Sequence, residues 1–132
     1  MTKQEEYHLN FTKIRTSNKT ILHYCVSADG ETQSQFFSTI LGDLDDIDTE
    51  ELIMSIEAVQ NGQPFEEYHN TDAIDDGFII KIVPPNLELG TQYVIALDDW
   101  KELMQEWLDF IKPRSLFGDL KKLLKRKRDK NH

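Results

Sequence analysis

The sequence predicts an α+β domain in which an antiparallel sheet of about five strands packs against two to three helices. Three observations support this class. Apolar and polar residues alternate near the N-terminus, apolar residues recur at helical spacing in three later segments, and no linker or repeat divides the 132 residues. The expected order is β-β-α-α-β-β-β-α with a basic C-terminal helix. We expect one α+β domain over 1–112 and a basic amphipathic helix and tail over 113–132.

The first two strands are expected to form a hairpin. Tyr7, Leu9 and Phe11 alternate with polar residues, as in a half-buried strand. A turn-like Thr-Ser-Asn segment follows, and the apolar and aromatic run 21–26 then supplies the partner strand.

Two helices follow the hairpin. Apolar residues recur at helical spacing over 36–41 and predict a short helix that stops near Gly42. A second helix is expected to begin at Asp48, whose side chain would cap it, and to end at Asn61-Gly62. Its buried stripe comprises Leu52, Ile53, Ile56 and Val59.

Three strands and the most regular helix complete the predicted fold. A polar strand at 65–69, a central apolar strand at 78–83 and a strand at 93–97 are separated by turn residues. In the helix at 100–111 the apolar stripe includes both tryptophans, which we expect to anchor the core. Asp99 is expected to cap this helix.

The charge of the chain is divided unevenly. Residues 1–111 hold twenty-two Asp or Glu against six Lys or Arg, a net charge of -16, whereas 112–132 hold two against nine, a net charge of +7. An acidic body repels phosphates, which disfavours nucleic acids and anionic membranes as direct ligands. It attracts a basic protein partner instead.

We therefore expect three acidic segments to bind a partner, with Tyr68 as an aromatic anchor. The alternative is a solvated acidic surface that keeps the protein soluble and caps helices. The candidate residues are Asp43, Asp45 and Asp46 before the second helix, Glu66, Glu67 and Tyr68 in the polar strand, and Asp72, Asp75 and Asp76 before the central strand.

Sequence motifs of common enzymes do not occur: GxGxxG, GxxxxGK[ST], HExxH and GxSxG are all missing. The acidic run that starts at Asp43 lacks the spacing of a calcium-binding loop, because Ile47 and Met54 stand where oxygen ligands are needed. The four histidines are not spaced with Cys25 as a zinc site requires. We expect no enzyme activity, cofactor or resident metal. An enzyme with an unrecognised carboxylate site is an alternative, and it requires a raised pKa in an apolar pocket.

The sequence also predicts the cellular compartment of the protein. Cys25 is the only cysteine, so no internal disulfide can form. The N-terminal segment lacks the apolar stretch of a secretion signal, and no run approaches the roughly eighteen apolar residues of a membrane span. We expect a cytoplasmic protein that does not contact a membrane.

Several segments between residues 48 and 112 carry a resemblance to a known group of proteins. They are IEAVQNG at 56–62, FEEY at 65–68, FIIKI at 78–82, and WKEL with WLDFI within 100–111. In this order they resemble small bacterial immunity proteins of polymorphic toxin systems, including contact-dependent growth inhibition. The resemblance implies a non-catalytic protein that binds one cognate toxin C-terminal domain, commonly a nuclease, and blocks its active site or substrate-binding surface.

Two further questions stay open at the level of sequence. A nucleic-acid mimic that inhibits a host or phage DNA-binding enzyme is an alternative, and it requires carboxylates spaced like phosphates along one elongated face.

The basic segment 113–132 has three interpretations. It is a solvated helix end, or it folds back over an apolar groove of the acidic body through Leu116, Phe117 and Leu120, or it contacts nucleic acid or lipid.

Overall fold

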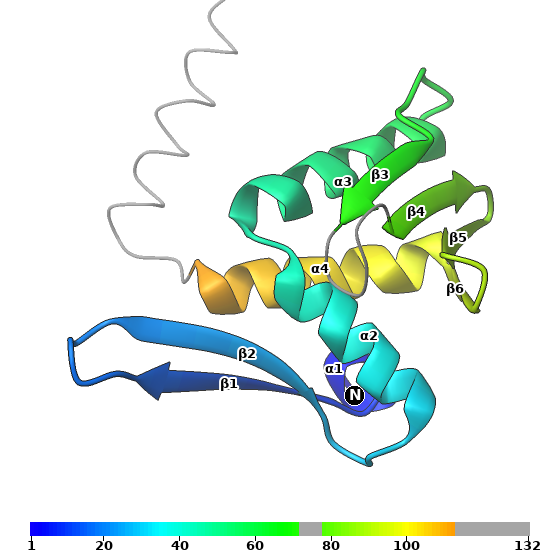
Figure 1. Cartoon of the computed structure of the whole chain (residues 1–132). Helices are drawn as coiled ribbons and strands as arrows, with labels where there is room; N and C mark the ends of the chain where they lie inside the picture. The colour runs from blue at the N-terminus through cyan, green and yellow to red at the C-terminus, as the bar shows by residue number, and fades with distance from the viewer. Residues whose placement is uncertain (72–77, 113–132) are drawn as a thin grey trace, which may run out of the picture.

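The computed structural model describes residues 1–71 and 78–112 (Figure 1). The predicted α+β class is confirmed, while the predicted basic helix and tail lie outside the described residues. Within the described ranges no helix combines the length and apolar character needed to span a membrane. The elements are α1 (Lys3–Glu6), β1 (Leu9–Arg15), β2 (Ile21–Ser27), α2 (Thr32–Asp43), α3 (Asp46–Gln60), β3 (Tyr68–Thr71), β4 (Phe78–Val83), β5 (Asn86–Leu89), β6 (Tyr93–Ala96) and α4 (Leu97–Ile111).

The strands divide between two antiparallel sheets. β1 and β2 form the expected hairpin, with Leu9 opposite Ser27 and Arg15 opposite Ile21. β3, β4, β5 and β6 form a second sheet in which each strand pairs with the next along the chain. The hairpin and the four-stranded sheet therefore do not share one continuous sheet in the described part of the chain.

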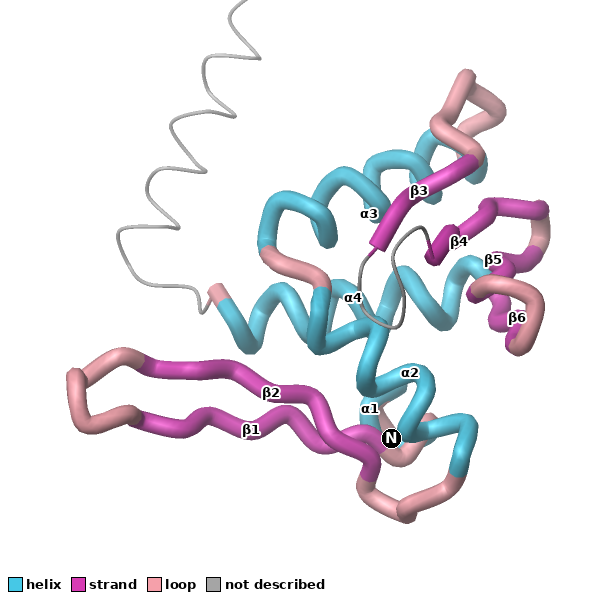
Figure 2. The backbone as a smooth tube through the Cα atoms, in the orientation of Figure 1, coloured by secondary structure: helices cyan, strands magenta, loops and turns pink. Residues whose placement is uncertain are grey.

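α4 runs between the hairpin on one side and α3 with the four-stranded sheet on the other (Figure 2). Its two tryptophans are buried, with exposures of 0% for Trp100 and 1% for Trp107. The Trp107 ring lies 5.1 Å from Phe11 on the hairpin, and the Trp100 ring lies 5.9 Å from Phe37 on α2, between ring centroids. The expectation that both tryptophans anchor the core is confirmed. Their rings join α4 to the hairpin and to α2, and α4 also contacts β5 and β6 of the four-stranded sheet.

The helix caps differ from the sequence-based prediction. Asp45 caps α3 instead of Asp48, because its Oδ1 accepts a hydrogen bond from the Asp48 backbone N–H at 2.7 Å. α4 begins at Leu97, after Ala96, whose side chain makes no capping hydrogen bond. The predicted cap Asp99 lies in the first turn and accepts a hydrogen bond from a distant side chain. Each helix therefore begins about one turn earlier than expected.

Two short elements were not predicted. α1 is a single turn whose Lys3 and Gln4 backbone N–H groups donate to the Glu106 carboxylate on α4 at 3.0 and 2.9 Å. β5 begins directly after Pro84-Pro85, the dipeptide that occupies the loop between the paired residues Val83 and Asn86. The dipeptide therefore joins two paired strands and does not end the sheet.

Candidate functional site

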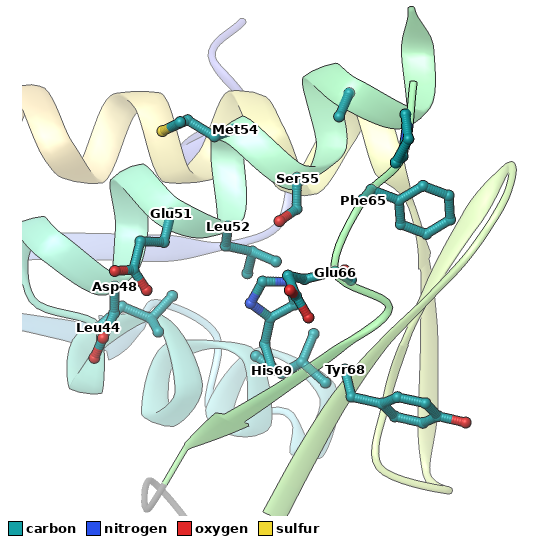
Figure 3. A pocket seen from close by; sticks show the side chains of 13 residues that line it. Leu44, Asp48, Glu51, Leu52, Met54, Ser55, Phe65, Glu66, Tyr68 and His69 are labelled. Carbon is teal, nitrogen blue, oxygen red and sulfur yellow. The ribbon is translucent and has the colours of Figure 1, made fainter. Parts of the chain in front are cut away.

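An open groove of about 680 Å³ lies between α3 and the segment that leads into β3 (Figure 3). Leu52 and Ile80, both buried, contribute to its base. Three carboxylates lie around it: Asp48 and Glu51 on α3, and Glu66 on the opposite side. We call this the α3–β3 groove, and it combines an apolar base with an acidic rim.

Helical spacing on α3 places the first two carboxylates. Asp48, Glu51 and Ser55 follow at intervals of three and four residues, so they share one face of the helix and line the groove. Ile53 and Ile56 lie on the buried side and belong to the hydrophobic core. Packing of that apolar side therefore holds the acidic face toward the β3 segment.

Exposed apolar side chains also lie at the α3–β3 groove. Met54 is 69% exposed, Tyr68 57% and Phe65 40%. Aromatic residues and Met are enriched at protein interfaces, where they supply much of the binding energy while charged neighbours supply specificity. The Tyr68 ring points away from the groove interior (Figure 3). The groove edge thus offers apolar contact area next to its carboxylates.

His69 extends into the α3–β3 groove from β3 (Figure 3). Its Nε2 lies 3.1 Å from the carbonyl oxygen of Glu66, so the imidazole is held against the backbone of the same segment. Across residues 1–71 and 78–112, no group of three His, Cys, Asp or Glu side chains is arranged to hold a metal ion.

The carboxyl group of Asp48 has a raised pKa. Burial raises its pKa above the ordinary value of 3.8, and the neighbouring carboxylates of Asp45, Glu51 and Asp43 raise it further. Both effects disfavour the charged form. A cation at the rim would offset the repulsion among the carboxylates, so this end of the groove favours a positively charged ligand.

Of the predicted residues in the polar strand, Glu66 and Tyr68 line the α3–β3 groove and Glu67 does not. The Glu67 carboxylate instead lies 3.7 Å from Lys81 Nζ. The same Lys81 ammonium lies 5.4 Å from the centroid of the Tyr68 ring. Glu67 and Tyr68 are thus grouped around a cation on β4, which lowers the local negative charge that the sequence suggested.

The other predicted residues lie elsewhere. Asp43, Asp45 and Asp46 line a separate groove near the C-terminal end of α4. Asp72, Asp75 and Asp76 lie outside the described residues. The structure therefore brings Glu66 together with Glu51 and with Asp48, for which the sequence analysis predicted a capping role. The polar spacing of 48, 51 and 55 was the signal that could have identified this face.

The hairpin is a basic region that the sequence analysis did not single out. Lys13, Arg15 and Lys19 are three of the six basic residues in 1–111, and no Asp or Glu occurs between residues 7 and 28. The charge of the folded protein is therefore unevenly distributed. The hairpin is basic, and the turn from α2 to α3, with Asp43, Asp45 and Asp46, is acidic. The outer face of the hairpin also exposes Ile14, Leu22, Tyr24 and Val26, each between 38% and 48%.

No family model, curated protein or solved structure matches this chain. The functional argument therefore rests on the α3–β3 groove, on its charges and on the apolar side chains at its edge.

Proposed function

We propose that this chain is a cytoplasmic immunity protein that binds one cognate toxin C-terminal domain, a nuclease, and neutralises it through an acidic surface. The observation that supports this function is the α3–β3 groove, in which Asp48, Glu51 and Glu66 surround an apolar base. A nuclease holds phosphates with Lys and Arg side chains. Such side chains can place their aliphatic stems on the apolar base while their cationic ends pair with the rim.

The two kinds of groove residue would contribute differently to binding. The carboxylates attract a basic domain over a distance and accelerate association, an effect that falls as salt is added. Met54 and Phe65 contribute contact area that slows dissociation once the partner excludes water. Burial is the main cause of the raised pKa of Asp48, and a cationic partner would offset the smaller contribution of the neighbouring carboxylates.

A small enzyme is the second candidate, because Asp48 has a raised pKa and lies with His69 in one groove. The two candidates respond differently to Asp48→Asn. An inhibitor would lose only part of its affinity, since Glu51 and Glu66 still line the groove. An enzyme that uses Asp48 in proton transfer would lose turnover altogether. The nucleic-acid mimic is distinguished by the identity of the bound partner.

The experiment is a pull-down of the tagged chain from its native host at moderate salt, with mass spectrometry of the retained proteins. We expect a basic toxin domain in equal amount. The double variant Glu51→Lys/Glu66→Lys should weaken this binding by about 100-fold or more, because it places like charges against a basic partner.

The matched control is Glu102→Lys/Asp109→Lys, which changes the net charge equally at exposed positions of α4 that do not line the groove. It should leave affinity within a few-fold of the unmodified chain. Equal losses in both double variants would show that net charge alone drives binding and would reject the groove. Recovery of a host nuclease or polymerase without a toxin domain would reject the immunity function.

A further inference from the structure

A second groove, of about 510 Å³, lies between β2, the turn from α2 to α3, and the C-terminal end of α4. We call it the α4-end groove. Ile21 and Leu22 of β2 both line it, but adjacent strand residues point to opposite faces, so Ile21 is the one whose side chain shares a face with His23, which packs on α4. Ile21 remains 47% exposed, so the described residues leave part of the groove's apolar surface in contact with water. Ile111 contributes a further apolar side chain, and Asp45 and Asp46 contribute carboxylates. Its chemistry favours a segment that is both apolar and basic.

The chain leaves α4 at this groove. Lys112, the last described residue, lines it, and the Lys112 Nζ lies 3.7 Å from Glu50 Oε1 on α3. Any residue that follows therefore starts beside the groove at a high effective concentration. Closing a short loop onto an adjacent surface costs little chain entropy compared with recruiting a separate molecule.

The composition of 113–132 complements the groove. These twenty residues contain eight Lys or Arg against two Asp or Glu. Five apolar residues are interspersed with them: Leu116, Phe117, Leu120, Leu123 and Leu124. Twenty residues can extend over roughly 66 Å, so reach does not limit binding to a surface that begins at residue 112.

We propose that segment 113–132 binds in the α4-end groove of its own chain. Its apolar side chains cover Ile21 and Ile111, and its basic side chains pair with the carboxylates beside them. The segment thereby covers the acidic turn from α2 to α3 of the same molecule. The α3–β3 groove stays accessible to a separate partner. The proposal does not depend on the identity of that partner.

Paramagnetic labelling of the full chain tests this contact. A nitroxide is attached to Asp119→Cys, a substitution that keeps every basic residue. Burial raises the pKa of the Cys25 thiol to about 12, which keeps it protonated and unreactive at neutral pH. A parallel Cys25→Ser background excludes labelling there. We expect strong broadening of the amide signals of Ile21 and Leu22, and little at Val94 on β6. Equal broadening at all these positions, or none, would overturn the proposal.

A charge-reversal pair tests the specificity of the contact. Asp46→Lys/Glu50→Lys reverses one carboxylate that lines the groove and the carboxylate that lies 3.7 Å from Lys112 Nζ, where the segment begins. It should abolish the broadening at Ile21 and Leu22, and Lys121→Glu/Lys122→Glu in the same chain should restore it. The matched control Glu57→Lys/Glu88→Lys, at positions that do not line the groove, should retain it. Dispersed amide spectra establish that each variant is folded. Loss in the control as well, or no loss in the first variant, would overturn the proposal.

A mixed sample shows whether the bound segment belongs to the same molecule or to a second copy. Spin-labelled chain without isotope is mixed with isotope-labelled chain that carries no nitroxide. Segment binding within one molecule predicts no broadening in this sample. Broadening at Ile21 and Leu22 would show that a second copy supplies the segment, which would overturn the intramolecular contact.

Discussion

The Tyr7 hydroxyl donates a hydrogen bond of 2.5 Å to Asp99 Oδ2, joining the residue after α1 to the first turn of α4 across 92 positions in the sequence. Lys3 Nζ lies 3.1 Å from the other carboxylate oxygen of Asp99. The hydrogen bond from Tyr7 lowers the pKa of Asp99, and the contact with Lys3 lowers it further. The N-terminal segment is therefore held to α4 by a carboxylate that the sequence analysis had taken for a helix cap.

Tyr7→Phe should lower the free energy of unfolding by about 1–2 kcal/mol at neutral pH, because it removes a hydrogen bond to a partly buried carboxylate. The pKa of Asp99 is lowered in the folded state, so its contribution is present above its ordinary value of 3.8. That contribution is lost as the pH falls through the folded-state pKa. Urea denaturation of both proteins over a pH series checks this. A difference that stays constant into acid would contradict the assignment.

Substitution by Phe should lower the free energy of unfolding by different amounts at the two tryptophans. Trp107 Nε1 donates a buried hydrogen bond of 2.9 Å to the Leu44 carbonyl oxygen. Trp100 Nε1 is buried without a hydrogen-bond partner among the described residues. Both substitutions remove core volume, but only Trp107→Phe leaves a carbonyl without its donor, so it should cost about 1–2 kcal/mol more. Urea midpoints of the two variants measure this difference, and equal costs would contradict it.

The cap of α3 can be tested with a matched pair. Asp45→Ala removes the side chain that accepts a hydrogen bond from the Asp48 N–H, and it should cost about 1 kcal/mol. Asp48→Ala keeps that bond and removes a carboxylate whose charged form is disfavoured, so it should cost less. Thermal unfolding of both variants provides the comparison. The reverse order would support the capping role that the sequence predicted for Asp48.

Gly90 should be far less tolerant of alanine than Gly62. Both have a positive φ, +61° and +68°, so each substitution carries a backbone strain of about 1–2 kcal/mol. A Cβ at Gly90 would also lie 2.7 Å from Cε2 of Phe78, whereas one at Gly62 would meet no heavy atom within 4 Å. The difference between the two unfolding free energies isolates the clash with Phe78. No difference would mean that the Phe78 ring moves aside freely.

Binding of a basic partner at the α3–β3 groove should weaken in acid sooner than ordinary carboxylates would require. The pKa of Asp48 is raised, so this side chain becomes neutral at a higher pH than the ordinary 3.8. Calorimetry with the retained partner over a pH series that descends from neutral toward the ordinary value of 3.8 should show falling affinity, and Asp48→Asn should reduce the slope. An unchanged slope in that variant would exclude Asp48 as the titrating group.

The fold was predictable wherever local pattern and tertiary packing agree. The hairpin, the end of α3 at Gln60 and the apolar stripe of α4 all follow from alternation, turn residues and helical spacing. α1 was missed because contacts with Glu106 on α4 support it, and no local pattern encodes such contacts. β5 was missed because four residues are too few to establish alternation and because Pro84-Pro85 indicated a break.

The candidate site was only partly predictable. The sequence grouped Glu66 with Glu67 and Tyr68. In the structure Glu66 and Tyr68 both line the groove, whereas Glu67 does not line it and pairs with Lys81. A capping role was predicted for Asp48, but its spacing from Glu51 puts both carboxylates on one face of α3, where they line the groove. Which carboxylates meet across a groove depends on how α3 packs against the β3 segment, and sequence order does not contain that information.

The place of α4 in the chain has a consequence for synthesis on the ribosome. It is the last described element to be made, yet its side chains contact both sheets, α2 and α3. Until it emerges, the apolar surfaces of Phe11 and Phe37 lack their tryptophan neighbours. The nascent chain therefore exposes apolar surface until α4 has been synthesised. Chaperones that bind such surfaces are expected to bind the hairpin and α2 during this time.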